Sequence, residues 1–321
     1  MDMSTWLVTG GGGYIGSHVA SLFLNEGFKV RIFDNFSAGY PIPEKKNLEV
    51  VKGDLSEFNL LSDSLKGVIG VIHLAGFKFP GESVKHPLIN YQTNFSGTLF
   101  LLQAMRNLGI RNLIFSSSCS VYGLPSSLPV TETTNLDPMS PYARSKFMAE
   151  KLIEDEFEAR KTTTEPINYS ILRYFNVAGR GNGGNQDISP HNLFPRIMKS
   201  IKEKSEIIVN GNNFHTLDGT CVRDYIHVSD VARAHLSLAS SMELNRRINQ
   251  TFNLSNEAPT SILQVIKIFE NQIGHELKYR YGNFRPGDPA EIFGSSEKFR
   301  KEFQWDPVYS IEDMVRSCFN V

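Results

Sequence analysis

Trp6-Leu-Val-Thr-Gly-Gly-Gly-Gly-Tyr-Ile-Gly-Ser17 is the stretch that decides the fold of this chain. Residues 6–9 are apolar enough to form a short buried strand, the glycines that follow predict a turn, and residues 17–25 predict a helix that stops at Gly27. A second strand is expected at residues 29–33, directly before Asp34. The chain therefore opens with a strand–turn–helix unit that leads into a second strand.

The same alternation continues well beyond the opening unit. Further strands are expected at residues 48–51, 70–74, 112–115 and 167–172, and helices between them include 94–107 and 142–159. Parallel neighbouring strands need crossover connections, so the alternation predicts a parallel sheet covered by helices on both faces. We expect the main run of the sheet to close with residues 167–172.

The second part of the chain is less regular. Residues 179–185 are rich in Gly and Asn, which predicts a loop at a lobe boundary. Beyond it we expect a helix at 193–203, a strand at 206–210 and a helix at 230–240. The predicted division is a dinucleotide-binding domain of residues 1–176 and a substrate lobe of residues 177–321, with residues 221–245 packing back onto the first domain.

Composition excludes several classes of protein. The 321 residues carry 33 Lys and Arg against 34 Asp and Glu, so no strong overall field attracts nucleic acid or an anionic membrane. Three widely separated cysteines, Cys119, Cys221 and Cys318, fit a reducing cytoplasm better than a disulfide framework, and none has zinc-ligand spacing. We expect neither a signal peptide, a membrane span nor a metal site.

The glycine-rich turn predicts a dinucleotide site. Gly10, Gly13 and Gly16 have the spacing G-x-x-G-x-x-G between a strand and a helix, where a pyrophosphate can approach backbone amides at the positive helix end. Asp34, at the end of the second strand, can bind both hydroxyls of an adenosine ribose and would repel a 2'-phosphate, which favours NAD over NADP. Asp54 either contacts adenine or caps a helix.

Tyr142-Ala-Arg-Ser-Lys146 predicts acid/base chemistry beside that dinucleotide. A tyrosine hydroxyl titrates near pH ~10, so it needs a nearby cation to act as a base at neutral pH. Lys146 lies four residues on, which places it on the same helix face, and we expect its charge to lower the pKa of Tyr142. Residues 116–118 are serines that follow a buried strand, at the edge where open α/β folds bind ligands.

Longer motifs carry a family resemblance. They are Thr9 to Ser17, His73-Leu-Ala-Gly76, Gly81-Glu-Ser-Val84, Phe115-Ser-Ser-Ser118, Val121-Tyr-Gly123, Tyr142 to Lys146, Arg173-Tyr-Phe-Asn176 and Asp218 to His227. With them the chain resembles the extended short-chain dehydrogenase/reductase family, and within it the UDP-glucose 4-epimerases. Related dehydratases typically carry Thr-Asp-Glu where this chain has Ser118-Cys119-Ser120, which argues against dehydration. The resemblance implies an α/β, Rossmann-type doubly wound parallel sheet with a smaller C-terminal α/β substrate lobe.

The resemblance also implies a mechanism and a cofactor. Tyr142 would take the proton of the sugar 4-hydroxyl while NAD accepts the C4 hydride, Ser118 would bond the same oxygen, and Lys146 would hold the ribose. NAD would then be retained rather than consumed. The residues expected around the cofactor are Gly10, Gly13, Tyr14, Ile15, Gly16, Asp34, Asn35, Asp54, Leu55, Ala75, Lys78, Asn94, Ser116, Tyr142, Lys146 and Tyr174.

A UDP-hexose substrate carries a diphosphate, which arginine matches with its fixed donor fork. Arg223 and Arg285 fill family positions for that contact. The other residues expected at the substrate, besides Ser118 and Tyr142, are Asn176, Asn192, Leu193, Asn210, Asp288 and Ile292. Asn210 stands where the family often has an aromatic residue beside uracil, and Ile292 is neither bulky nor small at the position that sets room around the sugar C2 substituent.

Three alternatives stay open at this point. A UDP-N-acetylglucosamine or UDP-pentose 4-epimerase would share nearly every motif, and a noncatalytic nucleotide-sensing protein could keep the glycines and Asp34 without needing Tyr142. The resemblance further implies a cytoplasmic homodimer in which the helices at residues 94–107 and 142–159 of each subunit form a four-helix bundle. Incubation with UDP-sugars without added NAD separates the functional alternatives.

Overall fold

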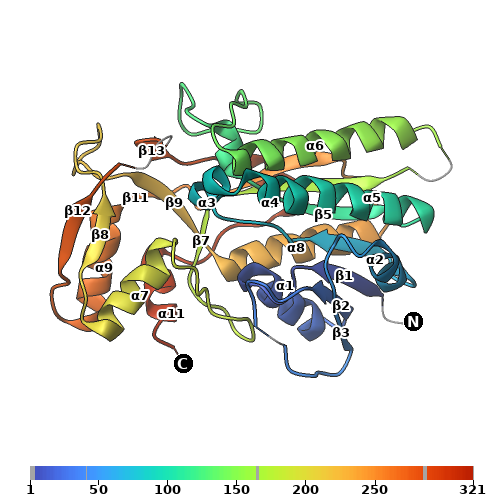
Figure 1. Cartoon of the computed structure of the whole chain (residues 1–321), viewed down its shortest axis with the longest axis horizontal. Helices are drawn as coiled ribbons and strands as arrows, with labels where there is room; N and C mark the ends of the chain where they lie inside the picture. Colours follow the sequence, from blue (N-terminus) through green and yellow to red (C-terminus); the bar gives the residue numbers. More distant parts are fainter. Residues whose placement is uncertain (1–3, 41, 164–165, 285–287, 321) are drawn as a thin grey trace.

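A seven-stranded parallel sheet organises the first part of the molecule (Figure 1). The computed structural model describes residues 4–40, 42–163, 166–284 and 288–320. Neighbouring strands of the large sheet follow the order β10-β6-β5-β4-β1-β2-β3, and every pairing is parallel. The strands are β1 (Thr5–Thr9), β2 (Lys29–Asp34), β3 (Leu48–Lys52), β4 (Gly70–His73), β5 (Asn112–Ser118), β6 (Asn168–Tyr174) and β10 (Gln250–Leu254).

Helices cover both faces of this sheet, because successive side chains of each strand point to opposite faces. Trp6 and Val8 of β1 pack toward α1 (Tyr14–Asn25) and α8 (Val228–Glu243). Leu7, between them, packs toward the opposite layer. That layer consists of α2 (Phe58–Leu65), α5 (Gly97–Asn107) and α6 (Pro141–Arg160). The expected doubly wound α/β fold is confirmed.

The seventh strand corrects one expectation. We expected the main run of the sheet to close with residues 167–172, but β10 pairs with β6 beyond it, in parallel register from Gln250 with Ser170 to Leu254 with Tyr174. The chain leaves the sheet after β6, builds part of the smaller lobe and returns. Helix α10 (Glu297–Phe303) then packs Phe299 against Phe252 of β10, with ring centroids 5.3 Å apart.

The helix expected at residues 94–107 has a different beginning. Short helices α3 (Pro80–Lys85) and α4 (Pro87–Tyr91) lead into a π-helix, η1 (Gln92–Ser96), and only then into α5. A π-helical turn is rare and occurs mostly at functional sites. The turn carries Asn94, which is buried.

The smaller lobe is built of short strands and three helices. Its four-stranded sheet contains β7 (Asn176–Ala178), β9 (Val222–His227), β11 (Pro259–Ser261) and β13 (Glu291–Ile292), and β8 (Ile207–Asn210) pairs with β12 (Tyr279–Gly282). The helices are α7 (Leu193–Glu203), α9 (Ile262–Ile273) and α11 (Ile311–Ser317). Phe194, Ile197, Val265, Phe269 and Met314 form their shared core. Figure 1 shows this lobe beside the carboxyl ends of the large sheet's strands.

A helix that spans a membrane needs about 20 consecutive, mostly apolar residues. In the part of the chain that the structure describes, none of them combines the length and the apolar character needed to cross a bilayer.

Candidate active site

The glycine turn after β1 forms a cradle that side chains would fill. Gly10 has φ of +72°, and a Cβ there would lie 2.5 Å from the Ala75 backbone nitrogen. A Cβ on Gly16 would lie 2.2 Å from the Gly10 carbonyl oxygen. Gly13 is the N-cap residue of α1, so the turn leads directly into the positive end of that helix. This backbone has the close approach and the free amides that a pyrophosphate needs.

Asp34 lies at the edge of the same cradle. It ends β2, and its carboxylate accepts hydrogen bonds from the backbone N–H groups of Gly12, at 2.8 Å, and Phe36, at 2.7 Å. The two bonds hold the carboxylate beside the glycine turn, where it can meet ribose hydroxyls. The residues therefore fit the adenosine half of NAD.

Asp54 lies close to Asp34 but is not a helix cap. Its carboxylate accepts the Asn35 amide at 2.8 Å and the Ser56 backbone N–H at 3.0 Å, and the hydrogen bonds from Ser56 lower its pKa. The N-cap residue of α2 is Glu57, so the capping alternative for Asp54 is wrong.

Asn94 organises the loop after β4. It accepts the Phe77 N–H at 2.7 Å and donates to the Phe77 carbonyl at 3.0 Å, which fixes the backbone beside Ala75 and Gly76. Lys78, one residue on, has its amine 3.7 Å from the Asp187 carboxylate. The expected residue Leu55 packs under this region, because a Cβ on Gly97 would lie 2.7 Å from its Cδ1 atom.

Asn185 and its loop were missed from the sequence, where residues 179–185 indicated only a lobe boundary. The Asn185 amide donates to the Gly12 carbonyl at 2.9 Å, and its backbone N–H donates to the Ser17 hydroxyl at 2.8 Å. The Tyr14 hydroxyl donates to the Gly179 carbonyl at 2.5 Å. This loop therefore closes over the start of α1. The asparagines within residues 179–185 were the sequence signal that could have indicated such side-chain contacts.

Ser118, Tyr142 and Lys146 come together at the carboxyl end of the sheet. Ser118 is the last residue of β5, and Tyr142 and Lys146 lie in the first turns of α6. The Ser140 hydroxyl caps that helix by accepting the Ala143 N–H, with Pro141 in the first turn. The Ser118 side chain lies close enough to Tyr142 to lower the pKa of its hydroxyl, against the larger effect of burial. The expected trio is therefore assembled.

The electrostatics of the trio differ from the expectation. Burial raises the pKa of Tyr142 to about 12, although Ser118 acts in the opposite direction. The Lys146 amine donates to the Ser116 carbonyl at 2.8 Å and lies 5.0 Å from the centre of the Phe115 ring. Burial also lowers the pKa of Lys146 to about 8. The prediction of a lowered Tyr142 pKa was wrong for the polypeptide alone, because desolvation by burial outweighs the lowering effect of Ser118.

The turn after β5 carries no carboxylate. Ser118 caps a short 3₁₀ helix, η2 (Cys119–Tyr122), and its hydroxyl oxygen accepts from the Ser120 backbone N–H at 3.2 Å and the Ser120 hydroxyl at 3.0 Å. Burial raises the pKa of the Cys119 thiol to about 12, so it stays protonated near neutral pH. The turn offers hydroxyl groups rather than a carboxyl acid/base pair.

Tyr174, an expected cofactor contact, ends β6 next to Ser118 in register. The Tyr174 hydroxyl lies 2.7 Å from His235 Nε2, and Ser116 opposes the rise in the Tyr174 pKa that burial causes. Burial lowers the pKa of His235 to about 4, so it is neutral near pH 7. His235 is a second residue that the sequence did not indicate.

Arg223, Asp288 and Ile292 lie together in the smaller lobe. A guanidinium nitrogen of Arg223 lies 3.0 Å from the Asp288 carboxylate. Ile292 pairs with Arg223 across β13 and β9, and it is buried in one cluster with Val121 of the catalytic turn. The expected residue Asn176 lies on β7, where it is aligned with Tyr225 of the neighbouring strand β9. Ile292 therefore links the strand that carries Arg223 to the catalytic turn.

The remaining expected substrate residues lie at element ends. Asn192 is the N-cap residue of α7 and donates its amide to Asp187 at 2.7 Å, and Leu193 is the first residue of that helix. Asn210 ends β8. Arg285 lies outside the described residues.

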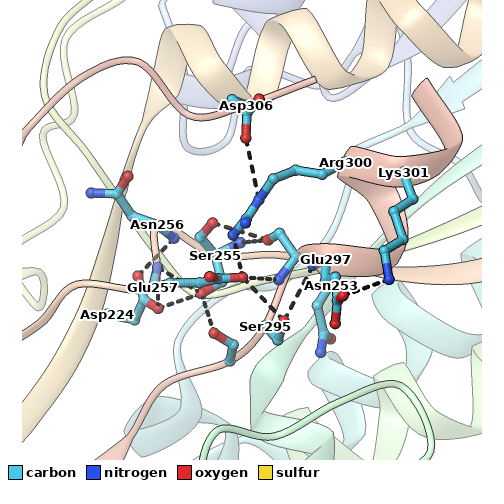
Figure 2. A network of polar contacts seen from close by, with 12 residues as sticks. Asp224, Asn253, Ser255, Asn256, Glu257, Ser295, Glu297, Arg300, Lys301 and Asp306 are labelled. Carbon is cyan, nitrogen blue, oxygen red and sulfur yellow. Dashed lines mark hydrogen bonds and ion pairs between the residues drawn. The ribbon is translucent and has the colours of Figure 1, made fainter. Parts of the chain in front are cut away.

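A buried polar network fixes the strand that carries Arg223 (Figure 2). The Asp224 carboxylate is fully buried and accepts the Asn256 N–H at 2.9 Å, the Glu257 N–H at 3.1 Å and the Ser255 hydroxyl. Burial raises its pKa to about 6. Glu257 continues the network by accepting the Ser296 N–H at 2.6 Å. The network joins β9 to the end of β10 and to the segment after Ile292.

A metal site would need several liganding side chains gathered at one point. Among residues 4–40, 42–163, 166–284 and 288–320, no group of three or more His, Cys, Asp or Glu side chains is arranged to hold an ion.

Comparisons with known proteins agree with this geometry. The model of the NAD dependent epimerase/dehydratase family matches residues 6–254. A UDP-glucose 4-epimerase from Bacillus subtilis is 36% identical over 322 residues, which is 96% of this chain and 94% of that protein. The crystal structure of UDP-glucose 4-epimerase from Bifidobacterium longum with NAD⁺ and UDP superposes with a TM-score of 0.89 at 32% identity, covering 98% of this chain and 96% of that one. A UDP-Glc/GlcNAc 4-epimerase from Campylobacter jejuni has a TM-score of 0.82 at 30% identity, covering 98% of each chain.

Proposed function

The chain belongs to the NAD dependent epimerase/dehydratase family, and from that premise we propose that it is an NAD-dependent isomerase that interconverts UDP-glucose and UDP-galactose. The observation that carries the proposal is the placement of Ser118, at the end of β5, beside Tyr142 in the first turn of α6, with the buried Lys146 one turn further along that helix. The turn Ser118-Cys119-Ser120 supports epimerisation over dehydration, because it offers no carboxyl acid/base pair.

The cofactor site supports the same activity. The glycine cradle after β1 and the Asp34 carboxylate fit the pyrophosphate and the adenosine ribose of NAD. NAD, when bound, supplies the acceptor for the C4 hydride and returns that hydride, so no net oxidation occurs. Lys146, buried next to Gly76 and Asn94, would hold the nicotinamide ribose.

The chain's own residues would move the proton. Tyr142, once ionised to the phenolate, would accept the proton of the sugar 4-hydroxyl as the C4 hydride leaves, which gives a 4-keto sugar. Ser118 would bond the same oxygen throughout. When the keto sugar presents its other face, Tyr142 returns the proton to the oxygen. The stereocentre at C4 is then inverted. The Arg223 guanidinium, now paired with Asp288, would exchange that carboxylate for the diphosphate.

Sugar breadth is the finer part of the proposal. Ile292 is buried against the catalytic turn and is intermediate in size, so a UDP-N-acetylhexosamine or UDP-pentose is the second candidate substrate. We also propose that residues 1–176 hold NAD and residues 177–321 hold the sugar nucleotide. In that arrangement α8 and β10 return from the second part to the first.

We propose that the protein works in the cytoplasm as a homodimer. Three free cysteines support a reducing compartment. Apolar side chains exposed on α4 and α6, among them Leu88, Ile89 and Met148, support a second copy of the chain on that face. Light scattering on the purified protein measures the mass directly, and a monomer at micromolar concentration would contradict the dimer.

The test of the activity uses purified protein without added NAD. UDP-galactose and UDP-N-acetylgalactosamine are incubated separately, and the epimeric products are separated by chromatography. Turnover of UDP-galactose without added cofactor is the expected result, because NAD is retained. Comparable turnover of the N-acetylated sugar would favour the broader substrate range. No turnover of either substrate, even with NAD supplied, would sink the epimerase proposal.

A further inference from the structure

A buried ion pair lies beneath the proposed acid/base trio. The Glu150 carboxylate and the Arg173 guanidinium form two hydrogen bonds, of 3.1 Å from Arg173 Nε and 2.6 Å from Arg173 Nη2. Glu150 is fully buried, and Arg173 is 4% exposed. Two parallel bonds of this kind hold a carboxylate in one orientation.

Further hydrogen bonds fix the pair within the sheet. The Ser117 hydroxyl donates to Glu150, and Arg173 donates to the Tyr122 hydroxyl at 3.1 Å. Tyr122 in turn donates to the Asn253 side chain at 2.7 Å. The carboxylate is thus tied to β5, β6 and β10, and the helix that carries it is α6.

Helical spacing places this carboxylate on the side of α6 that also carries Lys146. Glu150 lies four residues after Lys146 and eight after Tyr142, so the three side chains follow one face of α6. Burial lowers the pKa of Lys146 to about 8, and the Glu150 carboxylate opposes that fall. Without the Glu150 carboxylate, desolvation would lower the Lys146 pKa further.

The other groups around Lys146 do not replace that charge. From β5 it meets the Ser116 carbonyl and the Phe115 ring, and its amine would lie 3.4 Å from a Cβ on Gly76, close to the Asn94 side chain. Burial, together with the charge of Lys146, lowers the pKa of His73 on β4 to about 3, so its imidazole is neutral near pH 7. Tyr142, on the same helix, is held protonated near neutral pH by burial.

We propose that Glu150 is a positioning residue that keeps Lys146 in its charged form, and that Arg173 and Ser117 hold the Glu150 carboxylate in place for this purpose. The inference rests on the proposed function, in which a charged Lys146 binds the ribose and favours the phenolate of Tyr142. It extends the acid/base machinery one helical turn beyond the Tyr-x-x-x-Lys motif.

A merely structural ion pair would behave differently. Buried pairs are often replaceable without loss of stability, and removing a single partner of one destabilises the fold wherever the pair lies. Such damage lowers the melting temperature and the activity at every pH alike. A positioning role instead moves the pH at which Lys146 loses its proton.

The experiment compares Glu150→Gln with Arg173→Lys. Both substitutions disturb the same two hydrogen bonds, but only the first removes the negative charge. The chain is labelled with carbon-13 at the lysine Cε atoms, and the Lys146 resonance, identified by its absence in Lys146→Arg, is titrated. We expect the midpoint in Glu150→Gln to fall by about 1 pH unit or more, and the midpoint in Arg173→Lys to stay near that of the unsubstituted chain. Equal midpoints in Glu150→Gln and the unsubstituted chain would overturn the proposal, as would equal shifts in both variants.

Activity gives the second readout. With UDP-galactose, the alkaline limb of the kcat profile should move to lower pH in Glu150→Gln and not in Arg173→Lys. An unchanged alkaline limb in Glu150→Gln would contradict the proposal. Because the NMR titration needs no turnover, an inactive unsubstituted chain would refute the epimerase function without deciding the role of Glu150.

A double variant covers the case in which Glu150→Gln fails to fold. Glu150→Gln with Arg173→Gln leaves two amides that can bond each other, so neither position 150 nor position 173 keeps an unpaired charge. Its Lys146 midpoint should also lie below that of the unsubstituted chain. An unshifted midpoint in the double variant would overturn the proposal.

Discussion

The proposed active site has two ends that are built in different ways: a rigid end on the large sheet and an adaptable end in the smaller lobe. Tyr142, Lys146 and Ser118 stand on a 20-residue helix and a central strand, and the Lys146 amine is bonded to the backbone of that strand. Arg223, Asp288 and Ile292 stand on short strands and connecting segments of the smaller lobe. The acid/base residues, which every substrate would use, thus stand on long regular elements. The residues that would distinguish one substrate from another stand on short strands and loops, where substitutions are tolerated more easily.

The rigid end is tested most severely by Tyr142→Phe. The substitution removes the acid/base hydroxyl and keeps the ring, so kcat should fall by about 10²- to 10⁴-fold while retained NAD stays near its normal level. Tyr169→Phe, which removes a hydroxyl from a buried tyrosine at the amino end of β6, is the matched control. Near-normal activity of Tyr142→Phe would contradict the proton-transfer role, and so would an equal loss in both variants.

At the rigid end, the sequence was a good guide because local signals and tertiary packing agree. The strand–glycine–helix opening predicted β1 and α1 within a few residues, and Asp34 was correctly placed at the end of β2. The helix predicted at residues 142–159 corresponds to α6. The π-helical turn around Asn94 could not be read, since the same residues fit an ordinary helix. The predicted direction of the Tyr142 pKa shift was also wrong. Desolvation depends on which residues cover the ring, and the spacing of residues along one helix does not reveal them.

Outside that end, the sequence guided us less well. Residues 250–254 were not recognised as a strand of the large sheet, since Gln-Thr-Phe-Asn-Leu mixes polar and apolar residues and its partner β6 lies far back in the chain. Asn253 is buried because Tyr122 and the backbone of Val130 satisfy its side chain. Non-local partners of this kind are invisible to a pattern of hydropathy.

The adaptable end is tested by Arg223→Lys. Lysine keeps the positive charge but loses the planar fork that matches a diphosphate, so KM for the UDP-sugar should rise by roughly 10- to 100-fold with a much smaller change in kcat. Arg316→Lys on the exposed face of α11, where Arg316 pairs with Asp313, is the control and should change neither constant. A loss confined to kcat would remove Arg223 from substrate binding and place it with the chemistry.

The smallest effect is expected at Ile292, where the two ends meet. Its side chain packs with Val121, Tyr122, Val130 and Phe175, so it forms part of the wall between the catalytic turn and the smaller lobe. Ile292→Ala removes three carbons from that wall. We expect kcat/KM for UDP-N-acetylgalactosamine to rise about 10-fold relative to UDP-galactose, because a few methylene groups of space decide whether an extra substituent fits.

Stability loss must be separated from that change in selectivity. Ile292→Ala should cost about 2–5 kcal/mol of unfolding free energy, as large-to-small core substitutions do. Val265→Ala, in the core of the smaller lobe, removes buried methyl groups away from the proposed active site and serves as the control. Its ratio of kcat/KM values for the two sugars should stay constant while its melting temperature falls. If Ile292→Ala also leaves the ratio constant, the wall does not discriminate at C2, and substrate breadth must then be set by the loop-borne contacts of the smaller lobe.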